Sequence, residues 1–115
     1  MVVDDEVDIC LVLKIVLEKT GFLVDSYYNP ILALDEFKPN FYDLIILDLQ
    51  MPDINGLQLY REIKKRDVKA KICFLTASEY IFDIAYKFKP VYTFIRKPIQ
   101  NNDLIRIVND LLNNE

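Results

Sequence analysis

Histidine is missing from this 115-residue chain, and glycine occurs only twice. The absence of histidine excludes catalytic triads that depend on imidazole, zinc sites of the usual kind and a phosphohistidine carrier role. Two glycines are too few for the loops that bind nucleotide phosphates, and neither a GxGxxG nor a Walker A sequence occurs. Dinucleotide-binding and P-loop functions are therefore excluded.

The chain also has little excess charge, few cysteines and no long apolar run. Its 14 basic and 18 acidic residues give a net charge of −4 without a basic stripe, so we expect no direct binding of nucleic acid. No apolar run approaches the ~20 residues of a membrane-spanning helix, so we expect no membrane segment. Cys10 and Cys73 each lie in an apolar run. This placement favours buried thiols in a reducing compartment, the cytoplasm, over a disulfide framework.

What the chain does contain is a regular alternation of short apolar runs and amphipathic segments. The apolar runs predict strands at 1–3, 22–27, 43–47, 70–75 and 92–95. Helical spacing predicts helices at 7–20, 57–66, 78–88 and 102–113, and a short helix that starts at Asn29-Pro30 and ends before Pro39. Five strands that alternate with helices indicate one α/β domain with a doubly wound parallel sheet.

Reactive polar residues follow four of the five predicted strands. Asp4 and Asp5 follow the first strand, Asp48 the third, Thr76 the fourth and Lys97 the fifth. In a parallel sheet these positions meet at the carboxyl edge, where ligands bind. Three carboxylates in one place repel each other unless a cation joins them, and carboxylate oxygens suit Mg²⁺ first and Mn²⁺ next. A carboxylate nucleophile, a metal, a lysine and a hydroxyl are the groups that phosphoryl transfer requires, with Asp48 the best nucleophile.

Four motifs carry a family resemblance. In chain order, VVDDE, LDLQMPDINGL, FLTAS and FIRKPI resemble the receiver domain of two-component response regulators. The likeness spans essentially the whole chain, residues 1–115, and implies a flavodoxin-like (βα)5 fold with strand order 2-1-3-4-5. Only three residues precede the acid pair, so we expect the first strand to be clipped at its N-terminus.

The resemblance also implies a phosphorylation site and its metal ligands. It implies that Asp48 is the phosphoacceptor. Asp5 is then expected to bind Mg²⁺ directly and Asp4 mostly through water, with the backbone carbonyl of Gln50 as a further ligand.

Further residues match positions that stabilise and report the phosphoryl group in this family. Thr76 matches the switch hydroxyl and Lys97 the charge partner of a phosphoryl oxygen. Phe94 lies at the aromatic switch position. The peptide bond between Lys97 and Pro98 resembles the cis bond that aims the lysine at the site.

The function implied is signal reception. A sensor histidine kinase is expected to donate the phosphoryl group, and the face formed by 78–88, 92–95 and 102–113 is expected to change on phosphorylation. A downstream effector or a fused output domain would read that change, and a homodimer through the same face, with Phe82 and Tyr86, is a further expectation. The chain is not expected to be an enzyme beyond catalysing its own phosphorylation and slow dephosphorylation.

Two other functions match part of this pattern. A phosphatase of the haloacid dehalogenase type places an aspartate as general acid and base two residues after its nucleophile, where this chain has Gln50. Because an amide cannot transfer protons in this way, we reject that function. A pseudo-receiver that binds partners without phosphorylation stays open as the alternative, although the acids, the lysine and the acceptor are all present.

Overall fold

Five parallel strands form the centre of the computed structural model, which describes residues 1–79 and 93–113. The sheet order is β2-β1-β3-β4-β5, and every described pair is parallel. The predicted order is therefore confirmed. The strands are β1 (Val2–Val3), β2 (Ser26–Tyr27), β3 (Ile45–Asp48), β4 (Ile72–Thr76) and β5 (Thr93–Arg96).

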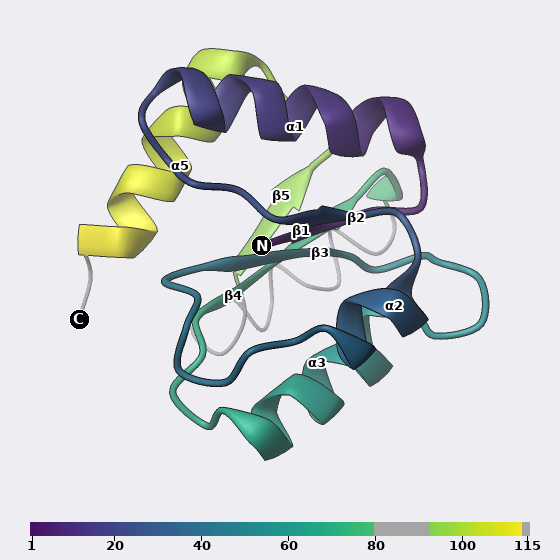
Figure 1. Cartoon of the computed structure of the whole chain (residues 1–115). Coiled ribbons are helices and arrows are strands. Elements are labelled where there is room, and N and C mark those ends of the chain that lie inside the picture. Colours follow the sequence, from purple (N-terminus) through teal and green to yellow (C-terminus); the bar gives the residue numbers. More distant parts are fainter. Residues whose placement is uncertain (80–92, 114–115) are drawn as a thin grey trace.

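Helices cover both faces of the sheet, as Figure 1 shows. Helices α1 (Val7–Lys19) and α5 (Asn101–Asn113) pack on one face, and α2 (Pro30–Asp35) and α3 (Gly56–Arg66) pack on the other. Among the described residues, no helix has the length and apolar character to cross a membrane. The predicted helix at 78–88, with Phe82 and Tyr86, lies outside the described residues beyond Glu79.

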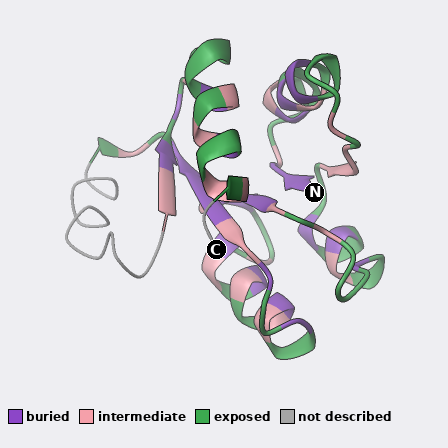
Figure 2. Ribbon diagram, turned by 90° about the vertical axis from the view of Figure 1, so that its left-hand side faces the viewer, coloured by how far each residue is buried: buried purple, intermediate pink, exposed green. Residues whose placement is uncertain are grey.

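Each face of the sheet has its own core, and the strands alternate between the two. Leu47 and Phe74 belong to the core under α2 and α3, whereas Ile46 and Leu75 belong to the core under α1 and α5. Figure 2 shows the resulting pattern, with buried strands at the centre and exposed residues on the outer sides of the helices. Burial on both faces explains why the central strands are continuous apolar runs.

Side-chain caps fix where two of the helices begin. The Asn29 side chain accepts hydrogen bonds from the backbone N–H of Ile31 at 2.9 Å and of Leu32 at 3.3 Å, and starts α2. Asn55 and Gln58 form a reciprocal capping box at the start of α3, with both bonds at 2.9 Å. Each cap satisfies backbone donors that the first helical turn leaves unpaired, and it thereby fixes the residue at which the helix begins.

The second strand is shorter than its apolar run predicts. The sequence predicts 22–27, whereas the strand comprises Ser26–Tyr27 alone. Its ladder partner is β1, which offers only Val2 and Val3 for pairing. The ladder between the two strands therefore comprises two pairs of residues, Val2 with Ser26 and Val3 with Tyr27.

Candidate functional site

Strand register brings the two central carboxylates side by side. Strands β1 and β3 are paired with Val3 opposite Leu47. The residue that follows each of these two is an aspartate, Asp4 after Val3 and Asp48 after Leu47. Both aspartates are buried, with 0% of Asp4 and 3% of Asp48 exposed. The expected meeting of strand ends is therefore present for these two acids.

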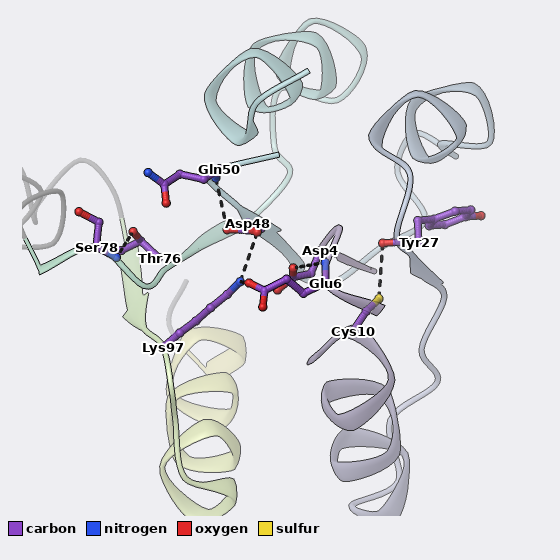
Figure 3. Close-up of polar contacts among 9 residues, drawn as sticks. All are labelled: Asp4, Glu6, Cys10, Tyr27, Asp48, Gln50, Thr76, Ser78 and Lys97. Carbon is purple, nitrogen blue, oxygen red and sulfur yellow. Dashed lines mark hydrogen bonds and ion pairs between the residues drawn. The ribbon is translucent and has the colours of Figure 1, made fainter. Parts of the chain in front are cut away.

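The neighbouring strands contribute the hydroxyl and the cation. Thr76, the last residue of β4, is paired with Arg96, and its carbonyl accepts a hydrogen bond from the backbone N–H of Lys97 at 2.8 Å. The predicted cis bond joins Lys97 to Pro98. Figure 3 shows Thr76 on one side of Asp48, and the Lys97 side chain reaching toward that carboxylate.

Lys97 is the electrostatic centre of the site. Its Nζ lies 2.7 Å from Asp4 Oδ2, 3.2 Å from Asp48 Oδ2 and 3.2 Å from Glu6 Oε1. Burial of the ammonium opposes its charge, but the contacts with these carboxylates outweigh that effect and raise the pKa of Lys97. Lys97 therefore remains a fixed positive charge beside the buried acids.

Asp48 differs from an ordinary surface aspartate in its protonation. Burial, followed by the nearby charge of Asp4, raises the pKa of Asp48 to about 7, although Lys97 and the backbone N–H of Gln50 act in the opposite direction. The Gln50 N–H donates to Asp48 Oδ1 at 3.3 Å. Without a further cation, a substantial part of the protein therefore carries a protonated Asp48 at neutral pH.

This raised pKa predicts that Asp48→Asn stabilises the metal-free protein above neutral pH. A carboxyl group whose folded-state pKa exceeds its unfolded value supports the fold at low pH, and that support is lost as pH rises through about 7. Because asparagine never ionises, the variant should exceed wild type by about 2 kcal/mol in free energy of unfolding at pH 8. The gain should shrink toward zero near pH 4, as measured by urea denaturation with a chelator present.

Asp110→Asn, which alters an exposed aspartate of α5, should leave the free energy of unfolding almost unchanged. A difference between Asp48→Asn and wild type that stays constant from pH 4 to pH 8 would contradict the assigned pKa.

Three carboxylates, from Asp4, Glu6 and Asp48, place oxygen atoms within 4.8 Å of one another. Asp5, which the family resemblance implies as a direct metal ligand, is not part of this group in the described chain; it is half-buried beside it. Residues two apart in extended backbone point to the same side, and Glu6 is still extended just before α1. That periodicity, applied to the DDE run, is the signal that would have found Glu6.

The same carboxylates have the chemistry of a site for a hard divalent cation. All three donors are oxygens, the ligand type that Mg²⁺ and Mn²⁺ prefer. In the described part of the chain, Asp4 Oδ2 is the buried side-chain atom that accepts no hydrogen bond of good geometry, although the Lys97 ammonium lies 2.7 Å away. An additional cation would satisfy this oxygen, so the residues fit a magnesium ion.

Two smaller features complete the predicted set. Thr76 is fully buried, and its hydroxyl oxygen accepts a hydrogen bond from the backbone N–H of Ser78 at 3.2 Å. Gln50 is exposed, and it lies on the other side of Asp48 from Lys97 in Figure 3. Phe94 is half-buried and stacks on Phe74 with 5.4 Å between ring centroids.

Comparison with known proteins agrees with this arrangement. The family model described as "Response regulator receiver domain" matches residues 1–109. The response regulator ArlR of Staphylococcus aureus (strain Mu50 / ATCC 700699) is 31% identical over 113 residues, which cover 97% of this chain and 51% of ArlR. The aerobic respiration control sensor protein ArcB of Escherichia coli (strain K12) is 46% identical over 66 residues, which cover 57% of this chain and 8% of ArcB.

Solved structures give the same result at the level of the fold. The non-phosphorylated HemR receiver domain from Leptospira biflexa superposes with a TM-score of 0.86 at 27% identity, covering 99% of this chain and 93% of that domain. The chain spans about half the length of ArlR and a small part of ArcB. The match of the family model over 1–109, the strand order and the convergent strand ends together establish that this chain belongs to the response regulator receiver domain family.

Proposed function

We propose that the protein is a phosphoacceptor receiver domain that takes a phosphoryl group onto Asp48. The observation that carries this proposal is the contact of Lys97 with two buried aspartates at the carboxyl edge of the sheet, at 2.7 Å and 3.2 Å. Two buried acids and a buried cation are costly to assemble and contribute little net stability. Such a cluster is better explained by a role in a reaction than by a contribution to the stability of the fold.

The proposed reaction is an in-line transfer from a phosphohistidine of a sensor histidine kinase. An oxygen of the Asp48 carboxylate forms a bond to phosphorus as the phosphorus–nitrogen bond of the donor breaks. Lys97 stabilises negative charge on a phosphoryl oxygen, and the Thr76 hydroxyl would donate to another. Asp48 must be ionised to attack, and because its pKa is raised, a bound cation would increase the ionised fraction at neutral pH.

The groups that would hold Mg²⁺, with Mn²⁺ as a substitute, are Asp4 and Asp48 of the carboxylate group together with Asp5 and the backbone carbonyl of Gln50. Glu6, the third member of the carboxylate group, instead contacts Lys97. When bound, the ion would supply charge neutralisation at the carboxylates and at the phosphoryl oxygens. The buried oxygen of Asp4 that accepts no hydrogen bond supports this assignment.

Signal reception, rather than turnover of an external substrate, is the role we propose. Gln50 offers no acid–base group beside the acceptor, so the acyl phosphate should decay slowly. The partners are then a histidine kinase and an effector or output domain. Thr76 and Phe94 would transmit the phosphorylation of Asp48 to the face that includes β5 and α5, where the effector binds. A homodimer would use the same face. The free, buried thiols of Cys10 and Cys73 support a cytoplasmic location.

The proposal is tested by intact-mass spectrometry after incubation with acetyl phosphate. Wild type should gain one phosphoryl group in the presence of Mg²⁺ and none after chelation. Asp48→Asn should gain none under either condition, because it lacks the nucleophilic oxygen.

Asp110→Asn provides the matched control, because it removes an exposed carboxylate from α5 and should be phosphorylated like wild type. An unmodified wild type that also fails to bind beryllofluoride would overturn the proposal. The chain would then be a pseudo-receiver that binds its partners without phosphorylation.

A further inference from the structure

Glu6 is the one solvent-exposed carboxylate among the three that contact Lys97 in the described structure. Its side chain is 57% exposed, whereas Asp4 and Asp48 are buried. Its backbone N–H donates to Asp4 Oδ1 at 3.0 Å, which holds the start of α1 over the acid pair. Figure 3 shows the Glu6 carboxylate beside the end of the Lys97 side chain.

Three carboxylates surround the ammonium group of the lysine, and Glu6 accepts a hydrogen bond from it at 3.2 Å. An ammonium group has three N–H donors, and three carboxylates lie within 3.2 Å of Lys97 Nζ. A phosphoryl oxygen that pairs with Lys97 must therefore compete with these carboxylates for the ammonium group.

Burial decides which carboxylate leaves. Asp4 is fully buried and has the shortest contact with Lys97, and Asp48 is the proposed acceptor and stays in place. Glu6 has a longer, rotatable side chain that already reaches water. Moving it costs less than moving either aspartate, because the Glu6 carboxylate is already 57% exposed and water can solvate it when it leaves Lys97.

We propose that Glu6 is the resting-state counter-ion of Lys97, which the incoming phosphoryl group must displace. Glu6 is thus a positioning residue: it orients Lys97 before phosphorylation and lowers the affinity of the site for phosphoryl donors and their analogues. This inference rests on the proposed function of Asp48, and it assigns to Glu6 a role in competition with the phosphoryl anion rather than in holding the metal.

The test is calorimetric binding of beryllofluoride, a phosphoryl analogue, to wild type and to Glu6→Gln at saturating Mg²⁺. The variant should bind the analogue about two- to five-fold more tightly, the range expected for loss of one ion pair whose carboxylate is exposed to solvent. The concentration of acetyl phosphate that gives half-maximal phosphorylation should fall by a similar factor. Binding of Mg²⁺ alone, measured in parallel, should weaken by no more than a few-fold.

Asp8→Asn is the matched control. Asp8 is an exposed carboxylate in the first turn of α1, and it is not part of the acidic group that contains Glu6. This variant removes the same charge near the site and should bind beryllofluoride like wild type. In the metal-free protein, the NMR signals of the Lys97 Cε protons should shift in Glu6→Gln and stay unchanged in Asp8→Asn.

Each contrary result has a distinct meaning. Equal affinity of Glu6→Gln and wild type for beryllofluoride, with wild type still phosphorylated, overturns the inference and leaves the proposed function intact. A loss of Mg²⁺ affinity greater than ten-fold assigns Glu6 to the metal and also overturns it. An equal gain in beryllofluoride affinity in Asp8→Asn would show that the loss of any negative charge near the site has this effect, which overturns the specific role of Glu6. A wild type that gains no phosphoryl group would overturn both this inference and the proposed function.

Discussion

Lys97→Met should lower the free energy of unfolding by about 3 kcal/mol at pH 8 in metal-free buffer. The methionine removes the cation that two buried aspartates share, at 2.7 Å and 3.2 Å, and it retains much of the apolar stem. Removing one partner of a buried ion pair leaves the other charges uncompensated, which costs more than the pair itself contributes. Urea denaturation in the presence of a chelator measures the loss.

The pH dependence and the effect of metal identify the cause. In this variant the pKa of Asp48 should rise further, because the neighbouring cation no longer favours the ionised form. A raised folded-state pKa means that stability is lost as pH rises, so the deficit relative to wild type should be smaller at pH 5 than at pH 8. Millimolar Mg²⁺ should restore part of the stability, because it replaces the missing positive charge.

Lys69→Met serves as the control, because Lys69 is exposed in the segment before β4. Its free energy of unfolding should change by less than about 0.5 kcal/mol at either pH. A Lys97→Met deficit that is equal at pH 5 and pH 8, and insensitive to Mg²⁺, would indicate lost packing instead of uncompensated charge.

The strand ends of this molecule could be predicted because parallel strands obey a simple geometric rule. Each buried strand ends in a polar residue, and in a parallel sheet all these ends lie along one edge. Asp4, Asp48 and Thr76 reach the edge as the last or next residue of β1, β3 and β4. For these residues, the apolar runs and their order along the chain are enough to predict that they lie at the same edge of the sheet.

The contacts among the side chains could not be predicted in the same way. Whether Lys97 contacts one carboxylate or three depends on rotamers and on the path of a long, flexible side chain. Glu6 joins Lys97 because the chain stays extended until α1 begins, and the sequence contains no obvious marker of that position. Similarly, β2 begins only at Ser26, opposite the first residue of β1, and no property of residues 22–27 reveals that start.

Gly56→Ala should destabilise the protein by about 3 kcal/mol. A Cβ atom at this position would lie 2.2 Å from the carbonyl oxygen of Asp48 and 2.8 Å from the Cα of Leu49. Both are backbone atoms, so the clash cannot be relieved by rotation of a side chain. The first turn of α3 must then move away from the end of β3, which breaks the bond from the Gly56 N–H to the Leu49 carbonyl.

The same displacement should reach the site, because the backbone that Gly56 contacts is that of Asp48 itself. We expect the affinity for Mg²⁺ to fall at least ten-fold, as measured by calorimetry at a temperature where the variant remains folded. Urea denaturation gives the free energy of unfolding of the same samples.

Gly21→Ala separates the steric effect from a general loss of stability. Gly21 has a φ of 99°, and a Cβ atom at this position would meet nothing within 4 Å beyond its chain neighbours, so alanine there meets backbone strain but no clash. The substitution should lower the free energy of unfolding by about 1–2 kcal/mol. It should leave the Mg²⁺ affinity unchanged, because Gly21 follows the C-terminal end of α1, away from the carboxyl edge of the sheet. Equal Mg²⁺ affinities in the two glycine variants would show that close packing of α3 on Asp48 does not position the acceptor.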